Sequence, residues 1–124
     1  MSKEMPSITE AEWEVMKVLW KESPLPANKV CTAIQAHEDW NPKTIRTLLD
    51  RLTKKKVVAV NKEQRVYTFT PLYSEHECQR AETQSFIDRI YGGTTKSLLV
   101  QFIEDETLSK EELKELREIL DKKI

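Results

Sequence analysis

The sequence predicts a mainly helical winged helix-turn-helix domain, made of three helices and a β-hairpin wing, followed by a C-terminal three-helix dimerisation domain. The chain has only two glycines in 124 residues, which favours helices over a turn-rich β-sandwich. Apolar residues recur at helical spacing in three successive segments before residue 56. The period then changes to the alternation of a strand pair. We place the two domains at residues 1–72 and 73–124.

The first two helices are predicted from a capping motif and two apolar stripes. Thr9 and Glu12 form a capping box, in which each side chain accepts a bond from the other's backbone N–H, and this helix runs to about residue 22. Pro24 and Pro26 end it, because proline cannot continue a helix. A short second helix covers about 26–37. The inner stripes are Ala11, Val15, Val18 and Leu19, widened by Met16 and Trp20, and then Ala27, Val30, Cys31 and Ile34.

The third helix and the hairpin follow directly. Asn41 is the predicted N-cap and Pro42 takes the favoured first helical position, so a helix is expected over 42–55. Strands are predicted at 57–60 and 65–70, joined by a polar turn over 61–64. The buried stripe of the third helix is Ile45, Leu48, Leu49 and Leu52, and the tryptophans Trp13, Trp20 and Trp40 are expected to pack.

The C-terminal domain is predicted to contain three short helices. Capping boxes begin helices at Ser74 and Ser109, Gly92-Gly93 ends the first of these helices, and an apolar cluster over 98–103 lies between them. Alone, such helices bury too little apolar area to offset their ordering entropy. Pairing with a second copy would bury more; the alternative is that they fold back onto the first domain. The expected interface comprises Phe86, Ile90, Leu98, Leu99, Phe102, Leu113, Leu116 and Leu120.

Positive charge is concentrated in the third helix and the hairpin. The whole chain has a net charge of −1, yet residues 40–65 contain eight Lys and Arg against two Asp and Glu. Such a local excess indicates contact with a polyanion, although basic residues can also simply keep a surface soluble. A protein-binding winged-helix module is the alternative from another functional class, and it would not share the steep salt dependence of DNA binding.

The third helix has the position of a recognition helix, which enters the major groove of DNA. Arginine can bond guanine, a threonine methyl can contact a thymine methyl, and lysine can hold phosphates. Lys54, Lys55 and Lys56 lie at the far end of the helix, where backbone contacts are expected. The candidate DNA-binding residues are Lys43, Thr44, Arg46, Thr47, Arg51, Lys54, Lys62 and Arg65, with double-stranded DNA as the partner.

Other functional classes find little support in the sequence. It contains no nucleophile–base pair, metal-ligand set or phosphate loop, so neither an enzyme nor a cofactor is expected. Cys31 is predicted to be a buried thiol, and neither His37 nor His76 has partners for a metal site. No apolar run approaches the roughly 18 to 20 residues that cross a bilayer, and the N-terminus lacks a signal peptide. We therefore expect a soluble cytoplasmic protein without membrane insertion.

Four segments carry a resemblance to a known family. They are ITEAEWEVMKVLW at 8–20, WNPKTIRTLLDRLTKKK at 40–56, RVYTFTP at 65–71 and SFIDRIYGGTTKSLLVQFIEDETLSKEELKELREIL at 85–120. Together they resemble the BlaI/MecI/CopY family of bacterial transcriptional repressors, of the penicillinase and methicillin-resistance type, over nearly the whole chain. The resemblance implies a homodimeric repressor of β-lactamase or penicillin-resistance genes on a palindromic operator, with Lys43, Thr44, Arg46, Thr47 and Arg51 on the recognition helix and Arg65 on the wing.

The resemblance also implies a mode of release. In the antibiotic-resistance members, a membrane sensor triggers proteolysis at an Asn-Phe bond in the dimerisation domain, and the matching position here is Gln101-Phe102. From its own neighbourhood, Phe102 is expected to serve core or dimer packing. The copper-responsive members carry a C-terminal cysteine cluster, whereas the last 46 residues here contain no cysteine, which argues against copper sensing. A family repressor of unrelated genes with a different inducer is the remaining alternative.

Overall fold

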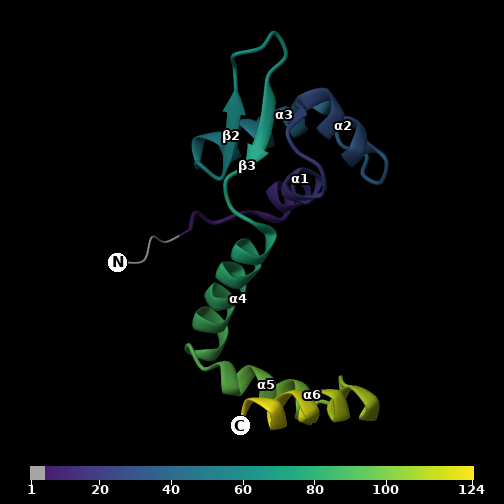
Figure 1. Ribbon diagram of the computed structural model, residues 1–124, viewed down its shortest axis with the longest axis vertical. Coiled ribbons are helices and arrows are strands. Elements are labelled where there is room, and N and C mark those ends of the chain that lie inside the picture. Colours follow the sequence, from purple (N-terminus) through teal and green to yellow (C-terminus); the bar gives the residue numbers. More distant parts are fainter. Residues whose placement is uncertain (1–4) are drawn as a thin grey trace. The chain divides into compact units, whose positions relative to one another are not determined.

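A computed structural model describes residues 5–124, which form six α-helices and one three-stranded sheet (Figure 1). The chain divides into two compact units, one up to Glu82 and the other Thr83–Ile124. This architecture confirms the predicted fold class, a mainly helical winged helix with a helical C-terminal part. The elements are α1 (Glu10–Lys21), β1 (Leu25–Pro26), α2 (Ala27–Gln35), α3 (Pro42–Lys54), β2 (Val58–Asn61), β3 (Thr68–Pro71), α4 (Glu75–Tyr91), α5 (Thr95–Glu104) and α6 (Lys110–Lys123).

Helix ends follow the predicted capping chemistry. The Thr9 hydroxyl accepts a bond from the Glu12 N–H at 3.1 Å, while the Thr9 N–H donates to Glu12 Oε1 at 2.9 Å. The same reciprocal pair joins Ser74 to Glu77 and Ser109 to Glu112. These side chains satisfy N–H groups that a helix leaves without partners in its first turn.

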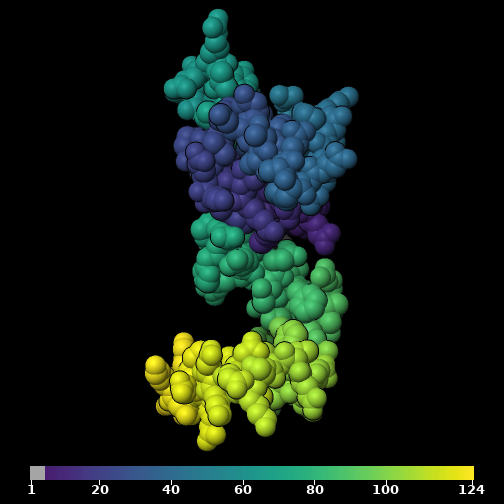
Figure 2. All heavy atoms as spheres, turned by 90° about the vertical axis from the view of Figure 1, so that its right-hand side faces the viewer, coloured from purple at the N-terminus to yellow at the C-terminus, as the bar shows by residue number. Residues whose placement is uncertain are grey.

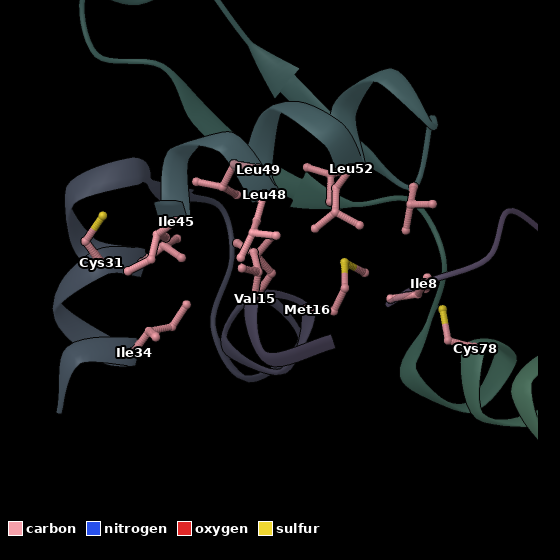
Figure 3. Close-up of a cluster of buried hydrophobic side chains, with 14 residues drawn as sticks. Ile8, Val15, Met16, Cys31, Ile34, Ile45, Leu48, Leu49, Leu52 and Cys78 are labelled. Atoms are coloured by element: carbon pink, nitrogen blue, oxygen red, sulfur yellow. The ribbon is translucent and has the colours of Figure 1, made fainter. Parts of the chain in front are cut away.

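The core of the first unit lies where α1, α2 and α3 meet (Figure 3). Val15 and Met16 from α1 face Leu48 and Leu52 from α3, and Ile34 packs from α2. Each helix therefore buries the stripe that its spacing predicts. Trp13, Trp20 and Trp40 pack against the edge of this core, and the Trp20 indole N–H donates to the Tyr73 carbonyl at 2.9 Å.

The sheet differs from the prediction in three respects. Its order is β1-β3-β2 with antiparallel pairing, and β1 was not predicted, because two residues beside prolines show no alternation. The predicted strand 57–60 begins one residue later in the structure, at Val58. The predicted strand 65–70 is wrong in its first half, since Asn61 pairs with Thr68 and the residues between them form the turn. This longer turn begins with a hydrogen bond that the Glu63 N–H donates to Asn61 Oδ1 at 2.9 Å.

The first unit extends into α4. Cys78, in the second turn of that helix, is only 1% exposed and packs near Ile8 in the same core (Figure 3). By its contacts the first compact unit ends at Glu82, whereas the domain boundary predicted from the sequence lies between residues 72 and 73.

The second unit contains the end of α4 and all of α5 and α6. Gly92 and Gly93 both have positive φ values, of 62° and 85°, which glycine adopts without a Cβ penalty, and they separate α4 from α5 as predicted. Ile87 is 3% exposed, but α5 and α6 contain no buried residue. The apolar side chains of this unit are therefore left largely open to solvent.

Candidate nucleic-acid interface

The outer face of α3 is a continuous polar and cationic surface. Ile45, Leu48, Leu49 and Leu52 point into the core, which fixes the rotation of the helix about its axis. The opposite side chains are then held in solvent. All eight candidate residues are exposed: Lys43, Thr44, Arg46, Thr47, Arg51, Lys54, Lys62 and Arg65.

The first turn of α3 is held by local hydrogen bonds. Asn41 Oδ1 accepts from the Lys43 N–H at 2.8 Å, and Pro42 needs no partner at this position because it has no N–H. The Thr47 hydroxyl donates to the Lys43 carbonyl at 2.9 Å. Thr47 therefore presents its methyl group and its oxygen lone pairs outward, so it can contact a thymine methyl or accept a bond.

A groove of about 600 Å³ separates α3 from the wing, which is the β2–β3 hairpin with its turn. Leu49, Val60 and Phe69 give it apolar walls, while Arg46 from α3 and Lys62 from the wing supply positive charge. Asp50 also lines it, but its carboxylate is 3.1 Å from Lys54 Nζ. The groove therefore keeps a positive character, which suits an anionic strand.

The tip of the wing projects from the first unit (Figure 2). Its turn carries Lys62 and Arg65, and the Lys62 ammonium lies 5.8 Å from the centre of the Tyr67 ring. This cation–π contact restrains a flexible side chain without neutralising its charge. Within the described part of the chain, neither Lys62 nor Arg65 forms an ion pair.

The three lysines at the end of α3 are not equivalent. Lys54 is exposed and its surface pair with Asp50 is weak, so the side chain remains available. Lys55, expected as a DNA-backbone contact, instead turns inward: its Nζ lies 2.6 Å from Glu12 Oε1 and 2.8 Å from the Ser7 carbonyl oxygen. In the chain without DNA a buried carboxylate therefore holds the charge of Lys55, so its side chain is not presented to solvent as that of Lys54 is.

Glu12 was recognised in the sequence only as a capping residue. The structure buries it completely, and its Oε1 accepts from both Lys55 and the Thr9 N–H. Burial raises the pKa of this carboxyl, but the Lys55 hydrogen bond, the Thr9 contacts and the Lys55 charge together bring the pKa below its ordinary value. One signal was present in the sequence: Glu12 lies beside the inner stripe, one residue after Ala11 and three before Val15.

The cysteines belong to the core, as predicted for Cys31. Both thiols are buried and free, and burial, with the nearby Glu77 charge, raises the pKa of Cys78 to about 11. Over residues 5–124, no three His, Cys, Asp or Glu side chains are grouped as metal ligands. No described helix has the length and apolarity to cross a membrane.

The eight predicted interface residues all retain exposed surface in the single chain. Leu98 and Leu113 are half-buried, and the other six are exposed, with Phe102 at 46%. The structure also exposes Ile103 and Ile119, which were not predicted as part of this surface.

The Gln101-Phe102 bond lies inside α5, three residues from its end. Gln101 Oε1 accepts a hydrogen bond from the Tyr91 hydroxyl at 2.6 Å. The backbone at this bond is therefore helical, and it is not presented as an extended segment.

Comparisons with known proteins agree with this arrangement. The penicillinase repressor family model matches residues 8–122. The chain is 42% identical over 119 residues to the penicillinase repressor of Bacillus licheniformis, which covers 96% of this chain and 93% of that protein.

The chain belongs to the penicillinase repressor family. This confirms the BlaI/MecI resemblance seen in the sequence. It is also 40% identical to the methicillin resistance regulatory protein MecI of Staphylococcus aureus (strain N315), over 94% of each chain. Among solved structures, it resembles the B. licheniformis BlaI monomeric form in complex with the blaP half-operator, with a TM-score of 0.53 and 44% identity. That match covers 62% of this chain and 93% of the BlaI chain.

Proposed function

We propose that the protein is a DNA-binding transcriptional repressor that occupies a palindromic operator as a homodimer. The observation that carries this function is the exposed cationic face of α3 beside a basic wing, in a chain 44% identical to a repressor solved with its half-operator. A repressor of this kind acts by occupying its site, and it needs no catalytic group.

The geometry suggests a division of labour at the interface. The N-terminal half of α3, with Lys43, Thr44 and Thr47, would lie against base edges in the major groove. One sugar–phosphate strand would then pass along the groove between α3 and the wing, where Lys62 approaches it from the wing, while Arg46 on the α3 side would reach base edges. Lys54 and Arg65 would add phosphate contacts, which set register without reading sequence.

We further propose that residues 73–124 make the dimer. Exposed Leu99, Phe102 and Leu120 give the C-terminal unit apolar surface that a second copy would cover. Two linked winged helices bind two half-sites with a high effective concentration, so separating them would greatly weaken occupancy.

The same surface offers a route to release. Cutting the Gln101-Phe102 bond would divide α5 and remove its apolar residues from the dimer. Because proteases need extended backbone, α5 would first have to open locally. In the single chain α5 has no buried residue, so its opening costs little there, whereas a second copy that covers α5 would raise this cost. Antibiotic-resistance genes as targets follow from the names of the relatives, and a membrane sensor and protease upstream of this step are implied by the family resemblance; both form part of the proposal.

Binding to selected duplexes tests the proposal. DNA selected from a random pool by the full chain should contain a palindrome, and affinity should fall steeply with salt, because displaced counterions are released. Arg46→Ala and Thr47→Ala should each reduce discrimination between the selected and a scrambled duplex by about 1–3 kcal/mol. Salt-independent binding would instead favour the protein-interaction module, and unchanged preference in both variants would refute this face as the reader.

A further inference from the structure

One ion pair joins the end of α3 to the beginning of α1. Lys55 is the C-cap residue of α3, and its ammonium contacts both Glu12 Oε1 and the Ser7 carbonyl oxygen. Glu12 lies in the first turn of α1 and also accepts the Thr9 N–H. A single ion pair therefore connects the α1 capping box, the segment before it and the end of α3.

The apolar core fixes the rotation of α3 about its axis, and the Lys55 contacts add a directional constraint to it. Burial of apolar area has no direction of its own. The two hydrogen bonds of Lys55 do have direction, and they fix one point at the C-terminal end of the helix. Lys43 lies at the other end, about 18 Å away at the rise of an α-helix, so a tilt about the core would shift the DNA-facing side chains.

A buried ion pair is not the arrangement that adds the most stability at such a place. Glu12 Oε2 is buried and accepts no hydrogen bond from the part of the chain that the structure describes. Buried ion pairs are often matched or exceeded in stability by apolar residues of similar volume, whereas they do impose a particular geometry. The arrangement is therefore better explained by positioning than by stabilisation.

We propose that Glu12 and Lys55 are positioning residues that set the recognition helix for operator discrimination, and that Lys55 is not a phosphate contact. This rests on the proposed DNA-binding function. It makes an unusual prediction for Glu12: a residue that is completely buried, and cannot touch DNA, affects which sequences the protein prefers.

The experiment compares five variants of the full chain on two duplexes: four with a single substitution and the double variant Glu12→Gln/Lys55→Met. The duplexes are the palindrome that the wild type selects from a random pool and a scrambled sequence of the same composition. Glu12→Gln and Lys55→Met remove the pair, Lys55→Arg keeps a cation, and Lys54→Met removes the neighbouring exposed lysine as a matched control. Circular dichroism identifies a temperature at which every variant compared is folded. Lys55→Met leaves the buried Glu12 carboxylate without its cation, so if that variant does not fold, the double variant, in which no charge is left buried alone, takes its place.

Positioning and phosphate contact predict different results. For positioning, Glu12→Gln and Lys55→Met should each lower discrimination by about tenfold, comparable to one mismatched base pair, with an unchanged salt slope. Their double variant should be no worse than either alone, and Lys55→Arg should recover most of the discrimination. Lys54→Met should weaken both duplexes alike and reduce the salt slope by about 0.9.

A different pattern of results would refute the positioning role. If Lys55→Met behaves like Lys54→Met while Lys55→Arg and any folded Glu12→Gln match the wild type, Lys55 is a phosphate contact and the proposal is wrong. If the wild type selects no sequence from the pool, the proposed function fails first, and the positioning role falls with it.

Discussion

Phe102 provides the most direct test of how the C-terminal unit is used. Its side chain is 46% exposed in the single chain, near the C-terminal end of α5, on a unit in which α5 and α6 contain no buried residue. If a second copy covers it, Phe102→Ala should weaken the dimer without disturbing the winged helix.

The size of the effect follows from the exposed fraction. Complete burial of a phenylalanine contributes about 1.5–3 kcal/mol, and roughly half of that remains to be gained on dimerisation, or about 1 kcal/mol. In a two-fold dimer the contact occurs in both protomers, so the total is about 2 kcal/mol, or an approximately 30-fold rise in the dimer Kd. Any cavity left behind would add to this value.

Sedimentation equilibrium of the full chain without DNA measures that Kd. Tyr67→Ala is the matched control, because Tyr67 is an aromatic residue at 50% exposure on the wing. Its Kd should equal that of the wild type. A Phe102→Ala chain with an unaltered dimer Kd, or a wild type that stays monomeric at high concentration, would refute the assignment of this surface.

Three further predictions concern the first unit. Leu52→Ala should lower the free energy of unfolding by about 2–5 kcal/mol in denaturant titrations, since Leu52 is fully buried between α3 and α1; a smaller loss would indicate a site that collapses easily. The pKa of Glu12 lies below its ordinary value of 4.5, so the ionised carboxylate adds to the free energy of unfolding above pH 4.5. That stability is lost as pH falls through the lowered pKa. In thermal melts, acid should therefore destabilise the wild type more than Glu12→Gln. Burial raises the pKa of Cys78 from 9.0 to about 11, so the neutral thiol stabilises the fold below pH 9.0, and about 3 kcal/mol of the free energy of unfolding is lost as pH rises through 11. Cys78→Ala should lack this extra alkaline loss. Equal loss of stability with pH in the wild type and the variant would contradict the prediction.

Local chemistry in the sequence was sufficient for the helices and for the outward-facing side chains of α3. Thr9, Ser74 and Ser109 begin helices where their capping boxes predict, and the glycine pair separates α4 from α5. The apolar stripe of α3 determines which residues are buried, and so it also determines that Arg46, Thr47 and their neighbours face outward. Caps, stripes and glycines act within a few residues, which is why they can be recognised without a structure.

Only the tertiary structure decided the features that join distant segments. β1 exists because Leu25 and Pro26 pair with Phe69 and Thr68. A strand of two residues is too short to show an alternating pattern, so the sequence alone does not predict it. Cys78 is part of the first core because the beginning of α4 packs there. The first compact unit therefore ends at Glu82, beyond the point where the sequence pattern changes. In the sequence, Lys55 is one of three consecutive lysines and has no evident partner. Glu12 is 43 residues away, and folding brings its Oε1 within 2.6 Å of Lys55 Nζ. Such contacts depend on the mutual placement of whole elements, which the periodicity of a single segment does not contain.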